Sequence, residues 1–402
     1  MSSAIQPLPP EASTEGLAAI VLAAGFSSRM GEFKPLLPLD GVTAFEWSIS
    51  LFREAGVAEV IAVLGHRADE LRPLAERCGA RCVINPYFEQ GMYSSIVAGS
   101  RALHGCAKAV FMLPADTPLV RAATVRQLAA AFAARQRGIV YPVFAGRRGH
   151  PPLIARDILS EASQNGTSGP LSALLAHHES DAIDLPVADE AIHLDMDTPA
   201  DYEALRSLAK RRDIPTAAEC EAILAGGHVQ QSVVRHSRKV ADVAHRIALA
   251  LLHSGVALNL ELVQAGALLH DLAKGQPDHA AVGASILRSM DFAQVAEIVG
   301  AHTDLDFSTL RIDESAIVYL ADKLVRGEDI ATLDKRFQPA LFRFRNNMPA
   351  LEAAHRRMRA AQDVALAVEM QMGAPLSSVA FEEVGSLASG SGASIAYKVA
   401  KI

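Results

Sequence analysis

Short apolar runs alternate with longer segments of mixed polarity over the first half of the chain. Runs of four to seven residues, rich in Val, Ile and Leu, are typical of strands buried on both faces. They occupy residues 17–23, 58–64, 81–84, 108–113 and 138–143. The intervening segments predict helices near residues 44–55, 66–77, 92–103 and 121–136. This alternation predicts βαβ units and a Rossmann-like α/β domain with a mostly parallel sheet.

The pattern becomes helical after about residue 208. A basic cluster precedes Pro215, and Thr216 is a suitable N-cap, so a linker followed by a helix is expected here. Apolar residues then recur at three- and four-residue spacing, as in 233–252, which predicts a second, all-α domain without strands. The expected segments are a flexible 1–16, an α/β domain over 17–208, a linker over 209–216, an all-α domain over 217–371 and a weakly ordered tail over 372–402.

Composition narrows the class of protein. The 402 residues carry a formal charge of −7, which argues against a non-specific nucleic-acid binder with a basic face. The four cysteines form no CxxC pair and are expected to be reduced thiols. The first sixteen residues lack the pattern of a secretory signal, and no apolar run is long enough to span a bilayer. We therefore expect a cytoplasmic protein without membrane or nucleic-acid partners.

A phosphate-binding loop is predicted directly after the first strand, where the chain reads LAAIVLAAGFSSRMGEFKPLLPL over residues 17–39. A strand that ends in small residues exposes backbone N–H groups, which bind phosphate. Arg29 and Lys34 follow at short distances and add the positive charge that a triphosphate requires. The sequence therefore predicts a nucleotide site at the carboxyl end of this strand.

Two aspartates are expected at the same edge of the sheet. Asp116 follows the strand at 108–113 within PADTP, and Asp197 precedes a helix start within LDMDTPADY. Because ligands of such sheets bind beyond the carboxyl ends of the strands, these carboxylates are expected to meet. Carboxylate oxygens suit Mg²⁺, and the predicted chemistry is in-line displacement at the α-phosphate with loss of pyrophosphate.

Five ordered blocks carry a family resemblance over residues 17–208. They are LAAGFSSRMGEFKPLLPL, GMYSSIVAG at 91–99, PADTP, GHPPLI at 149–154 and DMDTPADY. Together they resemble the molybdenum-cofactor nucleotidyltransferases of the MobA-like NTP transferase fold, and within it the molybdopterin cytidylyltransferases. The resemblance implies transfer of CMP from CTP to molybdopterin, for delivery to a molybdenum hydroxylase. The LAAG spelling favours CTP, by analogy only.

The resemblance also assigns residues to roles. It implies nucleotide binding by the loop backbone, phosphate contacts and catalysis by Arg29 and Lys34, and Mg²⁺ binding by Asp116 and Asp197. The expected nucleotide-binding set is Leu22, Ala23, Ala24, Gly25, Arg29, Lys34, Ser94 and Ser95, and His150 is expected near the acceptor. One departure concerns residues 165–175, NGTSGPLSALL, which lack the acid of the Gly-Asp-x-Gly motif common in the family.

A second site is expected in the helical half of the chain. His270 and Asp271 end an apolar run in AGALLHDLAKG, where burial of both groups requires a metal or a partner. His236 and Asp322 stand in other helical segments. Imidazole and carboxylate ligands together suit Mn²⁺, Fe²⁺ or Zn²⁺ rather than Ca²⁺. Such an ion lowers the pKa of bound water and provides hydroxide for attack on phosphorus.

The order His, His-Asp, Asp resembles the HD superfamily of metal-dependent phosphohydrolases over about 228–335. His279 and His302 fall between the His-Asp pair and Asp322, as in the two-metal members that include bacterial diadenosine-tetraphosphate hydrolases. The resemblance thus implies one or two divalent metals held by these six residues. Lys274 is expected one helical turn beyond His270, where it can meet a phosphate.

Three functions remain open at this point. The first is a bifunctional enzyme that joins the cytidylyltransferase to an active phosphohydrolase, whose substrate is a phosphate compound tied to the first reaction. The second keeps the nucleotidyl transfer but replaces the acceptor with a sugar phosphate or another phosphorylated alcohol. The third is a cofactor-delivery or regulatory protein whose HD domain binds a nucleotide without hydrolysing it. Turnover assays on each domain distinguish them.

Overall fold

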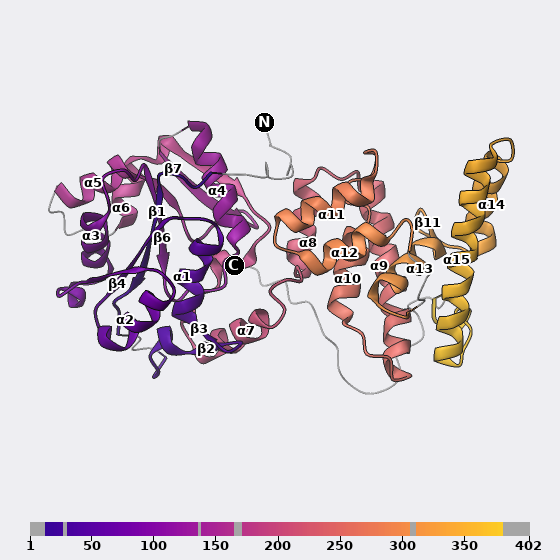
Figure 1. The fold of residues 1–402 in the computed structure, drawn as a ribbon, viewed down its shortest axis with the longest axis horizontal. Coiled ribbons are helices and arrows are strands. Elements are labelled where there is room, and N and C mark those ends of the chain that lie inside the picture. Colours follow the sequence, from indigo (N-terminus) through magenta and orange to yellow (C-terminus); the bar gives the residue numbers. More distant parts are fainter. Residues whose placement is uncertain (1–12, 27–29, 136–137, 165–170, 306–310, 381–402) are drawn as a thin grey trace. The chain divides into compact units, whose positions relative to one another are not determined.

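The computed structural model describes residues 13–26, 30–135, 138–164, 171–305 and 311–380. An α/β domain and a helical region follow one another along the chain, in the order that Figure 1 colours from indigo to yellow. The predicted class of each is confirmed. No helix in the described ranges combines the length and the apolar character that crossing a membrane requires.

The α/β domain is built on an eight-stranded sheet in its described residues. Its strand order is β10-β7-β9-β6-β1-β4-β5, and β8 pairs with β7. The bounds are β1 (Leu17–Ala23), β4 (Glu59–Leu64), β5 (Arg81–Ile84), β6 (Ala109–Pro114), β7 (Ile139–Phe144), β8 (Arg147–Arg148), β9 (Leu153–Ala155) and β10 (Ala182–Pro186). β1 pairs in parallel with both β4 and β6, whereas β9 is antiparallel to both of its neighbours. The five predicted strands therefore all exist, and the sheet is mixed but mostly parallel.

The strand order reverses at β1, since β4 and β5 extend the sheet on one side of it and β6 begins the other side. A crevice opens at such a reversal, beyond the carboxyl ends of the strands. The helices of this domain are α1 (Ala44–Glu54), α2 (Ala68–Arg77), α3 (Met92–Ala102), α4 (Ala122–Arg135), α5 (Arg156–Gln164), α6 (Leu171–His177), α7 (Pro199–Ala209) and α8 (Ala217–Gly226). A small hairpin, β2 (Pro38–Leu39) and β3 (Val42–Thr43), precedes α1. The crevice is therefore the expected ligand site.

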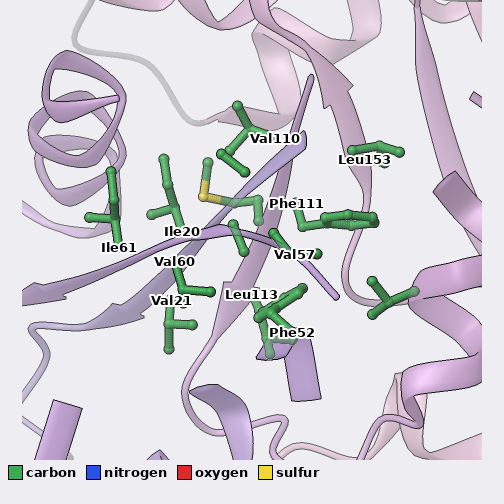
Figure 2. Close-up of a cluster of buried hydrophobic side chains, with 14 of the residues drawn as sticks. Ile20, Val21, Phe52, Val57, Val60, Ile61, Val110, Phe111, Leu113 and Leu153 are labelled. Atoms are coloured by element: carbon green, nitrogen blue, oxygen red, sulfur yellow. The ribbon is translucent and has the colours of Figure 1, made fainter. Parts of the chain in front are cut away.

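The core of the domain consists of side chains from β1, β4 and β6 packed against the helices (Figure 2). Ile20, Ile61 and Phe111 are fully buried in it. Helix α3 packs closely on the sheet at Gly99, where a Cβ atom would lie 2.9 Å from methyl groups of Ile20 and Val63. This close contact holds α3 against β1 and β4.

The helical region begins with a long amphipathic helix, which seven further helices follow in the described residues. Its helices are α9 (Gln231–His253), α10 (Leu260–Leu269), α11 (His279–Ser289), α12 (Ala293–Ala301), α13 (Glu314–Leu324), α14 (Leu333–Arg343), α15 (Met348–Met372) and α16 (Ser377–Ala380). One addition to the prediction is a short antiparallel hairpin of β11 (Val325–Arg326) and β12 (Asp329–Ile330) directly after α13. Gly327, with a φ of +65°, permits its tight turn, and a hairpin this short has no periodicity that the sequence could reveal.

Candidate nucleotide and metal sites

The predicted phosphate-binding loop leaves β1 between its two neighbouring strands. The N–H of Ala115 donates to the carbonyl of Leu22 at 3.0 Å, and the N–H of His66 donates to that of Ala24 at 3.2 Å. At Gly65, a Cβ atom would lie 2.7 Å from Phe88 and 2.9 Å from the Cβ of Ala24. The turn from Leu22 to Gly25 is therefore held by main-chain contacts on both sides. Arg29, which was expected to contact phosphate, lies outside the described residues.

Lys34 and the two predicted aspartates lie together. The Lys34 ammonium is 2.7 Å from Asp197 Oδ1 and 3.6 Å from Asp116 Oδ2, and the lysine is 9% exposed. Asp116 follows the carboxyl end of β6, while Asp197 directly precedes the Thr198 cap of α7. Residues more than 80 positions apart in the sequence thus form one charged cluster beyond the sheet.

Asp195 is a third carboxylate at this place, and sequence reasoning missed it. The Met196 side chain is fully buried, and its N–H donates to the carbonyl of Asp116 at 3.0 Å. Asp195 and Asp197, on either side of it, both line the same pocket. Desolvation and the neighbouring charges of Asp197 and Asp116 raise the pKa of Asp195. The alternation in Asp-Met-Asp was the available signal, because residues two apart in an extended segment point the same way.

The pocket has a volume of about 1540 Å³. Asp116, Ser94 and His150 contribute to its lining, together with Arg101 and Arg147. Desolvation lowers the pKa of His150, although the charges of Asp116 and Asp195 oppose the shift. Its imidazole is therefore held in the neutral form near pH 7.

The two predicted serines differ in position. Asn85, itself buried, donates through Nδ2 to Ser94 Oγ at 2.8 Å and to Ser95 Oγ at 3.0 Å. Ser94 lines the pocket, whereas Ser95 is buried behind it and is not among the lining residues. Asn85 thereby joins the end of β5 to the first turn of α3, and it was not identified from the sequence.

In the helical region, His270 and Asp271 follow α10 and are buried. His279 Nε2 lies 3.3 Å from Asp271 Oδ1, and the Lys274 ammonium lies 2.9 Å from Asp271 Oδ2. α10 ends at Leu269, so Lys274 lies in a turn rather than on the same helix as His270, and that part of the prediction was wrong. The turn after α10 brings His279, at the start of α11, next to Asp271.

His236 is oriented from both of its ring nitrogens. Nδ1 lies 2.9 Å from the carbonyl of Gly327, and Nε2 lies 3.2 Å from Asp322 Oδ1. Since a carbonyl only accepts, Nδ1 carries a proton, and Nε2 faces the Asp322 carboxylate. The β11–β12 hairpin provides this carbonyl, and an ion pair of Arg235 with Glu328 at 2.6 Å fastens the hairpin.

Five of the six metal-binding residues predicted in the helical region fall into two overlapping groups, and the sixth, Asp322, is in neither but lies beside His236. The ligand atoms of His236, His270 and Asp271 lie within 4.8 Å of one another, and so do those of Asp271, His279 and His302. Asp271 belongs to both groups. Nitrogen and oxygen donors in this mixture suit Mn²⁺, Fe²⁺ or Zn²⁺.

Comparison with known proteins places both halves of the chain. Residues 19–182 match the MobA-like NTP transferase domain, and residues 233–327 match the HD domain. The molybdenum cofactor cytidylyltransferase of Escherichia coli (strain K12) is 31% identical over 186 residues, which are 46% of this chain and 92% of that protein. The bifunctional protein GlmU of Pelobacter propionicus is 32% identical over 152 residues. That match covers 37% of this chain and 33% of GlmU, so the chain spans about a third of that relative.

A solved nucleotidyl transferase from Methanothermobacter thermautotroptrophicus is 26% identical, with a TM-score of 0.43. The alignment covers 49% of this chain and 98% of that protein.

Proposed function

The chain belongs to the MobA-like NTP transferase family and carries an HD domain, and on this premise we propose that it transfers CMP from CTP to the phosphate of molybdopterin. Pyrophosphate is the leaving group. The observation that carries the proposal is the cluster of Lys34, Asp116 and Asp197 beyond the carboxyl ends of β1 and β6. The similarity to a molybdenum cofactor cytidylyltransferase supports the choice of nucleotide and acceptor.

In this proposal the residues divide the work between binding and charge neutralisation. Backbone N–H groups of residues 22–25 bind the triphosphate, and Arg29 and Lys34 neutralise it. The triphosphate competes with the two aspartates for the Lys34 ammonium, so this lysine changes partners when the nucleotide binds. Ser94 contacts the base and ribose side, while Ser95 acts through Asn85. The remaining pocket, with His150, Arg101 and Arg147, receives the acceptor.

The carboxylates fit a magnesium ion. Asp116 and Asp197 offer the hard oxygen donors that Mg²⁺ prefers, and Asp195 adds a third beside them. When bound, the ion neutralises phosphate charge in the transition state and on the departing pyrophosphate. The three side chains keep their places through the buried Met196 and the main-chain contact that it makes with Asp116.

Pyrophosphate release tests the transferase proposal. The full-length protein is incubated with Mg²⁺, one nucleoside triphosphate at a time, and either molybdopterin or a panel of sugar phosphates. We expect release with CTP and molybdopterin only. Pyrophosphate release with a sugar phosphate but not with molybdopterin would show that the acceptor is a sugar phosphate. If no combination of nucleotide and acceptor released pyrophosphate, the transferase proposal would be wrong.

We also propose that the HD domain is a metal-dependent phosphohydrolase that acts on a compound tied to the transfer reaction, such as a spent nucleotide or a dinucleotide. The two overlapping groups of donors around Asp271 support one or two metal ions. A bound ion lowers the pKa of its water and supplies hydroxide. His236 is oriented by Gly327 at Nδ1 and by Asp322 at Nε2. Lys274, whose side chain is half exposed beside Asp271, is placed to meet a phosphate.

Hydrolysis by the full-length protein tests this second activity. Nucleotides and dinucleotides are screened with Mn²⁺, Fe²⁺, Co²⁺ or Mg²⁺ under anaerobic conditions, with Asp271→Asn as the negative control. Turnover that Asp271→Asn abolishes supports the proposal. Nucleotide binding without turnover under any of these metals favours a regulatory HD domain instead.

A further inference from the structure

A buried lysine follows the last predicted metal ligand directly. Lys323 is 8% exposed, and Asp322 is 7% exposed. The Lys323 ammonium lies 2.7 Å from Asp322 Oδ2. It also donates to the carbonyl of His302 at 3.2 Å. The Lys323 side chain therefore contacts two residues, Asp322 and His302, that are proposed to bind the metal.

The two carboxylate oxygens of Asp322 have different partners. Oδ2 accepts from Lys323, whereas Oδ1 lies 3.2 Å from His236 Nε2, and the other ring nitrogen of that histidine contacts the carbonyl of Gly327. A carboxylate fixed through one oxygen presents the other in a defined direction. The hydrogen bond from Lys323 to Oδ2 therefore orients Oδ1 toward the His236 ring, on the side where a metal is proposed to bind.

The second contact fixes the backbone at His302. This residue follows α12, and its side chain is 2% exposed. A hydrogen bond from a charged donor to its carbonyl holds the main chain from which the imidazole projects. The direction of that imidazole therefore depends on the same ammonium group that holds Asp322.

The surroundings of Lys323 suit a fixed cation. Its ammonium lies 4.6 Å from the centre of the Tyr319 ring, one helical turn earlier in α13, which is a cation–π contact. Tyr319 is fully buried and is itself held by a hydrogen bond of 3.1 Å to the carbonyl of Arg357. The lysine thus has a rigid base, in contrast to Lys274, whose side chain is half exposed.

We infer that Lys323 is a positioning residue of the HD metal centre, which orients Asp322 and the His302 segment for metal binding without itself touching the metal. The inference rests on the proposed function of the HD domain. Outer partners of metal ligands typically change metal affinity about 10–100-fold when they are removed. We expect an effect of this size from Lys323→Met, which keeps an unbranched side chain, one atom shorter, but removes the charge and both hydrogen bonds.

Cobalt binding to the full-length protein tests the inference. Co²⁺ is titrated while its visible absorption is followed, because imidazole ligands shift the d–d bands away from those of an ion that is held by oxygen alone, as at the transferase site. We expect Lys323→Met to bind about 10–100-fold more weakly with an altered spectrum, and Lys323→Arg, which keeps the charge, to recover part of the affinity. Lys335→Met, at an exposed position in α14, is the matched control and is expected to bind as the wild type does.

The possible results distinguish failure of the proposed metal centre from failure of the role proposed for Lys323. If the wild type shows no histidine-bound cobalt, the metal centre fails and the inference with it. If the wild type binds and Lys323→Met binds equally well with the same spectrum, only the inference is overturned. Circular dichroism checks folding, and Lys323→Gln replaces Lys323→Met if the latter unfolds. Unfolding of both variants also overturns the inference, because the lysine then serves the fold rather than the ligands.

Discussion

Lys34 Nζ and Asp197 Oδ1 lie 2.7 Å apart, although 163 positions separate the two residues in the sequence. The lysine begins a short 3-10 helix after β1 (Lys34–Leu36), and the aspartate directly precedes the N-cap of α7. This ion pair joins a segment near the start of the α/β domain to one near its end, beyond the carboxyl ends of the strands where nucleotide binding is proposed. It also means that the Lys34 cation offsets part of the negative charge of the carboxylates in the ligand-free protein.

Replacing Lys34 by Met is expected to separate catalysis from metal binding. Loss of a charge that stabilises the transition state typically lowers kcat by about 10²–10³-fold. The same change removes the positive charge beside Asp116 and Asp197, so half-saturation with Mg²⁺ should occur at a lower concentration. Pyrophosphate release measured against Mg²⁺ gives both numbers.

Lys108→Met is the matched control for Lys34, because Lys108 is exposed immediately before the amino end of β6, away from the site. It should leave both quantities unchanged. A Lys34→Met variant with normal kcat would remove this residue from the catalytic set.

Asp116→Asn is expected to abolish nucleotidyl transfer and leave phosphohydrolysis intact. The amide keeps the shape of the side chain but loses the charge that holds a divalent cation. Both reactions are measured on the same preparation, with Asp40→Asn as a control, because Asp40 is exposed and Asn tolerates its φ of +50°. If both activities disappeared in a folded Asp116→Asn protein, the two sites would not be independent.

The central strands and the charged cluster could both be predicted because each is visible in a short stretch of sequence. β1, β4 and β6 are long apolar runs, and their loops carry residues whose chemistry is evident from type and order alone. β9 has three residues and the β11–β12 hairpin has two per strand, so neither has a period to detect. Both depend on partners that folding provides.

Site residues that act through others were missed for a related reason. Asn85 matters because it reaches two serines of α3, and Lys323 because it reaches a carbonyl 21 positions earlier. Contacts of this kind follow no regular sequence spacing, so they cannot be recognised before the fold is known. Asp195 is different, since its alternation with Met196 and Asp197 was visible. Counting the apolar Met as the inward position would have found it.

Removal of metal is expected to destabilise the helical region and abolish phosphohydrolysis. A ligand present at 100 times its Kd stabilises the folded state by about 2.7 kcal/mol, so chelation should lower the melting temperature by several degrees. Added Mn²⁺ should restore both properties in the wild type. In Asp271→Asn, which weakens both donor groups, chelator and Mn²⁺ should make little difference to the melting temperature. Equal metal responses in the two proteins would place the ion elsewhere.

A buried ionic cluster ties α8 to the α/β domain. Arg121, 2% exposed, lies 2.9 Å from Asp189 and 2.5 Å from Glu219, which is fully buried in α8. Arg121 also donates through Nη2 to the carbonyl of Arg212 at 3.2 Å, within the segment expected to be a linker. The ionic contacts of this domain therefore continue beyond residue 208.

Glu219→Ala should consequently destabilise the α/β domain by about 1–3 kcal/mol, because it leaves buried guanidinium N–H groups unsatisfied although Asp189 still pairs with the charge. The chain has one tryptophan, Trp47 in α1, and Arg212 lies over its ring at 4.9 Å. Its fluorescence during urea unfolding of the full-length protein thus reports on this domain alone. Glu203→Ala, at an exposed position in α7, should change stability by less than about 0.5 kcal/mol. A Glu219→Ala midpoint equal to that of the wild type would show that α8 contributes nothing to the transferase half.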